Sequence, residues 1–234
     1  MRSKRMRLDR FLTTQAHISP SQVRPTIARG SVRVDGAMAT GISQVVDHFS
    51  RIELDGKILQ AREPVYFMLH KPCGVVSATR DGKHQTVIDL LAKKDREQLH
   101  IAGRLDYNTT GLVLLTNDGG WSRSLSEPGR NVAKTYQVCL ENPLTPHYIQ
   151  AFAEGMYFPY EDSTTRPAEL RIISDYLAEV RLTEGKYHQI KRMFGRFQNR
   201  VLALHRSAIG NLVLDPALAA GKYRALTGQE ISDI

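Results

Sequence analysis

The sequence predicts an α+β protein: a small domain of two helices and short strands, followed by a larger, mixed but mostly antiparallel β-sheet with flanking helices. The first sixty residues hold two helical patterns and then short alternating strands that end in Asp-Gly. The remainder holds many short strand patterns with helices between them, which is typical of an α+β domain. A chain of 234 residues is long enough for two such cores.

The formal net charge of +8 is unevenly distributed along the chain. Residues 1–62 hold 11 Lys and Arg against 5 Asp and Glu, whereas the rest holds 21 against 19. A small basic piece joined to a nearly neutral body favours a nucleic-acid-binding module attached to a second functional domain. The simpler interpretation is a charged surface that only keeps the protein in solution.

Helix signals open the first domain. The segment MRLDRFLTTQAH places three apolar residues at helical spacing. A second helix is expected over Gln22–Arg29, with Ser19 as its N-cap, Gln22 completing a capping box and Gly30 ending it.

Two strands follow, Ser31–Gly36 and Arg51–Gly56, and each ends in an Asp-Gly turn. We therefore expect one domain over residues 1–60, a polar linker over 61–65 and a second domain over 66–234.

The second domain is predicted from alternating strand and helix patterns. The strands are expected at Val65–Leu69, Val75–Ser77, Leu112–Thr116, Thr135–Leu140, Ala168–Ile173, Leu177–Leu182, Val201–Leu204 and Leu212–Leu214. The helices are expected at Val87–Leu91, Asp118–Ser126, Thr145–Gly155 and Tyr187–Phe197, with a last one that begins at a Thr227/Glu230 capping box.

A loop rich in Gly, Asn and Thr precedes a buried strand in the window Ala102–Gly119, and Asp106 lies within it. Loops that a rigid scaffold holds in place often carry reactive groups. By composition alone, a turn-forming role for Asp106 is the commoner outcome. However, GRLDYNTTGL (Gly103–Leu112) resembles the motif of the pseudouridine synthases, and that resemblance implies that Asp106 is the catalytic carboxylate.

Two more segments resemble the same family. Lys134-Thr135-Tyr136 is similar to its K-x-Y strand, which implies that Tyr136 stacks on the target base. EGKYHQIKRMF (Glu184–Phe194) is similar to a basic segment in which Lys191 would pair with the catalytic Asp. By residue type alone, Tyr136 is as readily a core aromatic, and Lys191 part of a solvated helix face.

The resemblance also implies RNA-binding residues. Arg104 would contact phosphate or fill the gap left by a flipped base, and Arg192 would bind RNA. ARGSVRVDG (Ala28–Gly36) resembles the S4 RNA-binding domain, whose second helix and following turn contact structured RNA. The S4-like residues expected to bind RNA are Arg24, Arg29 and Arg33.

The resemblance covers nearly the whole chain and is nearest to the branch named after the small-subunit ribosomal synthase A. It implies isomerisation of one uridine in 16S rRNA, either free or in an assembly intermediate. A 23S-directed sister branch remains an alternative. It also implies that no cofactor or metal takes part. We further expect a cytoplasmic protein, because Cys73 and Cys139 lack metal spacing and no apolar run is long enough to cross a membrane. A monomer is the default expectation for its oligomeric state.

Isomerisation requires the base to leave its stack, and an ionised carboxylate can then attack the nucleoside or stabilise charge at C1′. A lysine beside the carboxylate favours the charged form. Two alternatives stay open: a non-catalytic S4-type RNA-binding or ribosome-assembly factor, and a metal-dependent nuclease. The nuclease candidates are Asp106, Asp118 and Glu184.

Overall fold

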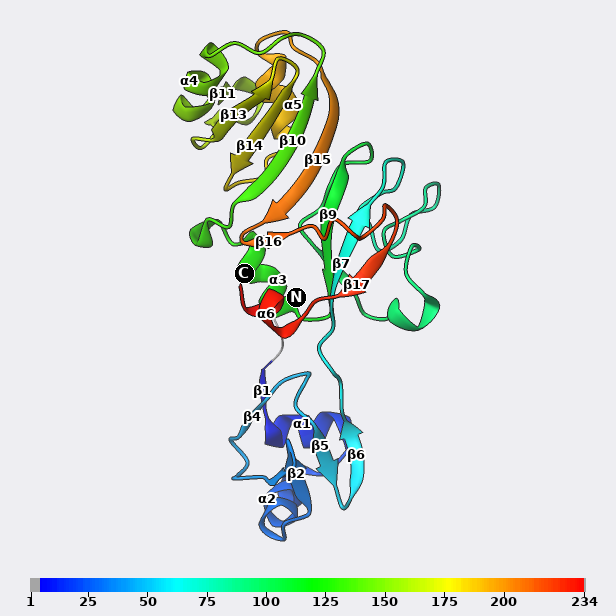
Figure 1. The fold of residues 1–234 in the computed structure, drawn as a ribbon. Helices are drawn as coiled ribbons and strands as arrows, with labels where there is room; N and C mark the ends of the chain where they lie inside the picture. The colour runs from blue at the N-terminus through cyan, green and yellow to red at the C-terminus, as the bar shows by residue number, and fades with distance from the viewer. Residues whose placement is uncertain (1–4, 234) are drawn as a thin grey trace. The chain divides into compact units, whose positions relative to one another are not determined.

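The computed structural model describes residues 5–233, which divide into two compact units. Unit 1 comprises the chain up to Val65 together with Asp118–Gly120, and unit 2 comprises the rest. Figure 1 shows the fold of each unit.

Unit 1 is built from two helices and two small sheets. Its elements are β1 (Met6–Arg7), α1 (Leu8–Gln15), α2 (Pro20–Ala28), β2 (Val32–Val34), β3 (Ala37–Met38), β4 (Val45–Val46), β5 (Ile52–Leu54) and β6 (Lys57–Gln60). The antiparallel order is β3-β2-β5-β6, and β1 pairs with β4. Apolar faces of both helices and of β2, β4 and β5 form one core, which is why the helical and alternating patterns coexist there.

Both Asp-Gly turns of unit 1 adopt the left-handed backbone that such tight hairpins need. Asp35 and Gly36 have φ of 52° and 82°, and Asp55 and Gly56 have φ of 49° and 79°. The predicted Ser19 capping box is wrong. Ser19 is the N-cap of α2, but its hydroxyl lies 3.2 Å from the Ser21 hydroxyl and makes no capping hydrogen bond.

Unit 2 is built on a nine-stranded sheet. Its strands are β7 (Tyr66–Lys71), β8 (His100–Ala102), β9 (Thr110–Thr116), β10 (Lys134–Leu140), β13 (Glu169–Ser174), β14 (Leu177–Leu182), β15 (Val201–Ile209), β16 (Leu212–Val213) and β17 (Tyr223–Ala225). The α-helices are α3 (Gly119–Ser126), α4 (His147–Glu154), α5 (Gln189–Gly195) and α6 (Gly228–Ser232). The 3-10 helices are η1 (Lys93–Asp95), η2 (Pro128–Arg130) and η3 (Pro159–Glu161). A separate hairpin is formed by β11 (Tyr157–Phe158) and β12 (Ser163–Thr164).

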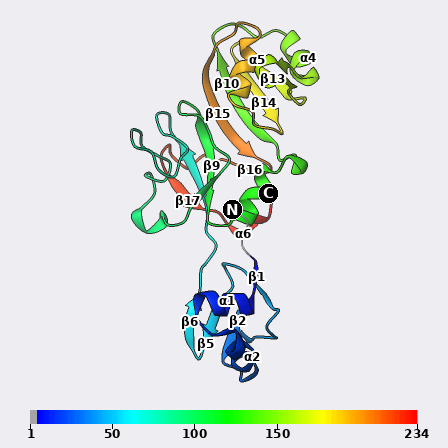
Figure 2. The same ribbon diagram turned by 180° about the vertical axis from the view of Figure 1, so that it is seen from behind.

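The sheet runs in the order β13-β14-β10-β15-β9-β7-β17, with β16 beside β15 and β8 beside β9. All pairs are antiparallel except β15 with β9, which are parallel and meet through only His205–Thr110 and Arg206–Gly111. Both ribbon views show β10 and β15 side by side on one part of the sheet, and β9 and β7 on the other (Figure 1, Figure 2). The short parallel pairing is therefore the junction of two antiparallel parts.

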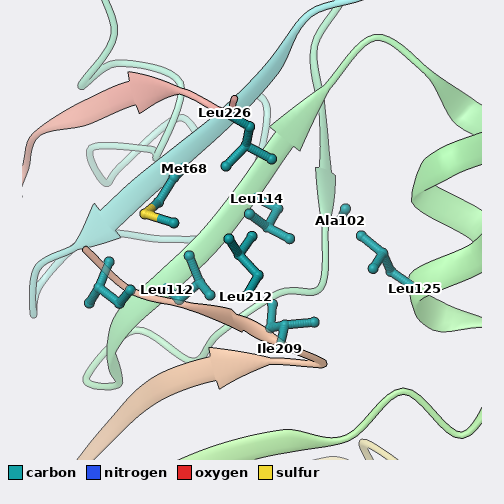
Figure 3. Close-up of a cluster of buried hydrophobic side chains, with 9 residues drawn as sticks. Met68, Ala102, Leu112, Leu114, Leu125, Ile209, Leu212 and Leu226 are labelled. Atoms are coloured by element: carbon teal, nitrogen blue, oxygen red, sulfur yellow. The ribbon is translucent and has the colours of Figure 1, made fainter. Parts of the chain in front are cut away.

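One face of this sheet is covered by a core that joins distant parts of the chain. Met68, Leu112 and Leu114 of β7 and β9 pack with residues from α3, β15, β16 and the C-terminal segment (Figure 3). β9 is buried along nearly its whole length, which explains its almost uninterrupted apolar sequence.

Three further sequence predictions need correction in unit 2. Residues 87–91 form turns instead of a helix, because the Asp89 carboxylate accepts hydrogen bonds from the Thr86 N–H and hydroxyl and closes a tight turn. Val75–Ser77 is not a strand; Val76 forms a single bridge with Thr86. The basic helix begins at Gln189 instead of Tyr187, because His188 has a φ of 49°. The Thr227/Glu230 capping box is confirmed.

Gly111→Ala should strongly destabilise the protein. Gly111 has a φ of +109°, and an added Cβ would lie 2.3 Å from the Arg206 carbonyl oxygen at the parallel junction. We expect a loss of more than about 3 kcal/mol in the free energy of unfolding, measured by chemical denaturation. Gly82→Ala is the matched control, because its Cβ would meet nothing within 4 Å. Equal stability of the two variants would contradict this account of the junction.

Candidate active site

The loop that connects β8 to β9 carries Asp106, and its backbone is held by hydrogen bonds along most of its length. The Ser77 hydroxyl donates to the Leu105 carbonyl at 2.8 Å and accepts from the Leu105 N–H at 3.0 Å. The Thr109 N–H donates to the Asp106 carbonyl, and the Gly74 N–H to the Tyr107 carbonyl. Asp106 therefore sits on a fixed backbone.

A fully buried lysine at the end of β7 fastens the same loop. The Lys71 ammonium donates to the carbonyl oxygens of Pro72 (3.0 Å), Tyr107 (3.0 Å) and Thr109 (2.8 Å). Burial away from water lowers the pKa of Lys71 to about 8, while the neighbouring Cys73 and Asp106 act in the opposite direction.

A buried arginine of β15 holds the loop from the other side. The Arg206 guanidinium donates to the carbonyl oxygens of Leu112 (2.8 Å), Gly103 (2.7 Å) and Arg104 (3.3 Å). Arg206 is only 1% exposed, so these three oxygens replace the water that a guanidinium otherwise binds. The strand junction and the start of the Asp106 loop are thus one structural unit.

The Asp106 carboxylate has two basic neighbours from the start of α5. The Lys191 Nζ and the His188 Nε2 each lie 3.4 Å from Asp106 Oδ2. His188 and Lys191 are three residues apart, which brings their side chains to the same side of the chain. The three side chains are between 31% and 36% exposed, so the cluster is open to a ligand.

Asp106 and Lys191 line a cavity of about 620 Å³, and Tyr136 of β10 lies in its wall. Tyr136 is opposite Arg206 in the sheet, at a β-bulge where the register between β10 and β15 shifts. Bulges commonly redirect side chains beside active sites. A buried tyrosine ring in this wall provides a flat apolar surface next to a carboxylate.

The structure thus brings together four of the predicted residues: Asp106, Tyr136, Lys191 and Arg104, which also lines the cavity. The Arg104 side chain is exposed and makes no hydrogen bond or ion pair within residues 5–233. The Arg192 side chain points to other partners: it pairs with Glu161 and lies over the Phe158 ring. The Glu161 carboxylate raises the pKa of Arg192.

The three S4-like arginines belong to unit 1. Arg24, Arg29 and Arg33 are all exposed, and Arg24 lines a hollow that also includes Gly30 and Met38.

Comparison of the chain with known proteins identifies its family. A family model described as RNA pseudouridylate synthase matches residues 65–195. A *Pseudomonas aeruginosa* protein named ribosomal small subunit pseudouridine synthase A is 51% identical over 98% of this chain and 100% of its own length. The chain belongs to the pseudouridine synthase family.

Further comparisons agree with this assignment. The *Yersinia pestis* protein of the same name is 42% identical over 98% of both chains. A crystal structure of a pseudouridylate synthase, 38% identical, matches 97% of this chain and 99% of its own with a TM-score of 0.72. The mixed α+β fold with a mostly antiparallel sheet is therefore confirmed as that of this family.

Across residues 5–233, no group of three or more His, Cys, Asp or Glu side chains is arranged to hold a metal ion. In the same part of the chain, every helix is too short or too polar to span a bilayer.

Lys71, His188 and Arg206 are the site residues that sequence analysis missed. Lys71 ends a largely apolar strand and Arg206 interrupts another, which is a sequence signal of a buried cation. The carbonyl groups that such a cation binds come mostly from distant parts of the chain, so the sequence does not identify them. His188 lies within a recognised motif, yet its contact with Asp106 depends on the left-handed backbone before α5.

Activity should fall as the pH rises through about 8, because neutral Lys71 has fewer donors for the three carbonyl oxygens. The free energy of unfolding should instead rise with pH in this range. The pKa of Lys71 is lower in the folded protein than in the unfolded chain, so at a pH between these two values the unfolded chain binds more protons. Single-turnover rates and denaturation curves between pH 7 and 9 test this. Lys71→Met should have lower activity and lack the fall near pH 8; the same fall in that variant would assign it to another group.

Proposed function

We propose that this protein isomerises a uridine of small-subunit ribosomal RNA to pseudouridine, with Asp106 as the catalytic carboxylate. The single observation that carries the residue assignment is the convergence of Asp106, Lys191 and Tyr136 on one cavity in a chain of this family. The names of the relatives support the small subunit as the source of the RNA.

The reaction breaks the N1–C1′ bond of the nucleoside and forms a C5–C1′ bond, while a proton leaves C5 and N1 gains one. The uridine must first be flipped out of its stack into the cavity. Asp106, ionised, then attacks the nucleoside or stabilises the charge that develops at C1′. The Lys191 ammonium, 3.4 Å from Asp106 Oδ2, orients the carboxylate by charge attraction.

Two further residues position the RNA. The Tyr136 ring provides the surface on which the detached uracil stacks while it turns, since a flat aromatic face tolerates rotation of the base. Arg104, exposed at the rim and without a protein partner in the described chain, binds phosphate or fills the space that the flipped base leaves. The positioning of Arg192 by Glu161 favours a structural role for that arginine over direct RNA binding.

Unit 1 is proposed to act as an S4-like RNA-binding domain that covers residues 1–60, with a linker over 61–65. Its two helices, hairpin turns and exposed Arg24, Arg29 and Arg33 support this role. Exposed arginines bind the RNA backbone through charge, which contributes affinity without reading the base sequence.

The decisive test of the activity is pseudouridine mapping on 16S and 23S transcripts and on small-subunit assembly intermediates, after incubation with the purified protein. We expect one new pseudouridine in 16S rRNA. Asp106→Asn should lower the rate by on the order of 10³-fold or more, because the amide cannot act as a nucleophile or anion. Asp175→Asn, a change at an exposed turn, is the control. Modification by Asp106→Asn at the normal rate would refute the assignment.

The double variant Arg24→Gln/Arg29→Gln should bind the same transcript more weakly and with a smaller dependence on salt. Loss of two phosphate contacts should lower the slope of log K against log salt by about 1.5. Filter binding at several salt concentrations measures this. The control is Lys93→Gln/Lys94→Gln, which removes two charges from η1. An equal change in the salt slope of RNA binding for this control would mean that only the net charge of the protein matters.

A further inference from the structure

A second cavity, of about 630 Å³, lies in unit 2 and shares Arg104 and Tyr136 with the first. It extends to the Lys134 end of β10, to Thr183 and Glu184 after β14, and to Leu125 of α3. The activity proposed above uses Arg104 and Tyr136 but gives no role to Lys134.

The walls of this cavity carry a large excess of positive charge. The cationic residues that line it are Arg104, Lys134, Arg166, Lys186 and Arg206. The carboxylate residue in its lining is Glu184, whose Oε1 accepts hydrogen bonds from the Arg166 backbone N–H and the Gln189 side-chain amide. One carboxylate among several cationic side chains leaves the lining with an excess of positive charge, which suits an anion.

Lys134 is the clearest sign of a missing anionic partner. Its ammonium donates to the Val132 carbonyl at a long 3.3 Å, and within residues 5–233 it forms no ion pair. Burial, and then the nearby Arg206 guanidinium, lower the pKa of Lys134. Holding a half-buried cation beside another cation costs stability, which is characteristic of a binding site.

The position of Lys134 relies on the regular geometry of β10. The register shift at Tyr136 concerns the pairing with β15, whereas β10 pairs with β14 without a shift from Lys134 to Tyr136. Lys134 and Tyr136 are two residues apart, so their side chains leave the same face of the strand about 6.6 Å from each other. That separation is short enough for one RNA strand to place a base at Tyr136 and a neighbouring phosphate at Lys134. An RNA whose uridine occupies the Tyr136 wall would bring an adjacent phosphate toward Lys134 and Arg104.

We propose that the second cavity is a phosphate subsite, in which Lys134 binds a backbone phosphate next to the target uridine, with Arg104 between the two cavities. The inference rests on the proposed function, since it uses Tyr136 as the uridine's position. It assigns to Lys134 a role in positioning the RNA.

The test combines a protein change with an RNA change. Lys134→Met removes the charge and keeps the length of the side chain. A series of synthetic RNA oligonucleotides contains the target uridine. In each oligonucleotide, one phosphate that flanks this uridine is replaced by a neutral methylphosphonate. We measure the dissociation constant of every protein–RNA pair, with Lys94→Met, which removes an exposed lysine outside both cavities, as the control.

We expect Lys134→Met to weaken binding of the unmodified RNA about tenfold. At one phosphate beside the uridine, neutralisation should weaken RNA binding by the unaltered protein and by Lys94→Met to a similar extent. RNA binding by Lys134→Met should stay nearly unchanged when the same phosphate is neutralised. The thermal midpoint of Lys134→Met should rise, because a half-buried repulsive charge is gone. The subsite would be overturned if, at every phosphate, the losses of binding free energy from Lys134→Met and from neutralisation simply add.

The readouts also separate this inference from the proposed function. The unaltered protein on unmodified RNA reports pseudouridine formation by itself, whereas the subsite is judged from binding alone. Pseudouridine formation together with additive losses rejects the subsite and retains the activity. Coupling at one phosphate without pseudouridine formation supports the subsite and rejects the activity.

Discussion

The buried Arg206 guanidinium is the interaction on which the site depends. Two antiparallel parts of the sheet meet through one short parallel pairing, where Gly111 lies against the Arg206 backbone. The Arg206 side chain crosses this junction and binds the carbonyl groups of Gly103, Arg104 and Leu112. A guanidinium presents several donors in a rigid plane, so it joins three backbone oxygens that no apolar residue would satisfy. The loop that carries Asp106 is therefore aligned by the same contact that joins the sheet.

Lys71 complements Arg206 from the opposite side of the loop, and the pair has an electrostatic consequence. Both cations are satisfied by carbonyl oxygens, which leaves their positive charge uncompensated by any ion pair in the described chain. The Lys191 ammonium approaches Asp106 as well, so the Asp106 loop has cationic side chains on several of its segments. Such surroundings attract a polyanionic ligand.

Short-range sequence rules predicted some local structure correctly and failed elsewhere, since Ser19 forms no capping box although its sequence fits one. The two Asp-Gly turns of unit 1 and the Thr227 capping box formed as predicted, because their hydrogen bonds close within a few residues. Residues 87–91 were predicted to be helical from apolar spacing, but the Asp89 carboxylate closed a turn instead. The helix that contains Lys191 starts later than expected because His188 adopts a left-handed backbone. Side-chain hydrogen bonds and isolated backbone reversals are not encoded in apolar periodicity.

The sequence by itself determined the family and the identity of the residues gathered at the cavity, since GRLDYNTTGL, KTY and the basic segment each keep their motif in contiguous residues. It also determined the α+β class through strand and helix periodicity. Only the tertiary structure decided which groups surround Asp106. Lys71, His188 and Arg206 reach the Asp106 loop from strands and turns distant in sequence, and Arg192 turns instead to Glu161. These neighbours depend on strand order, register and burial, which are properties of the packed chain and not of any local segment.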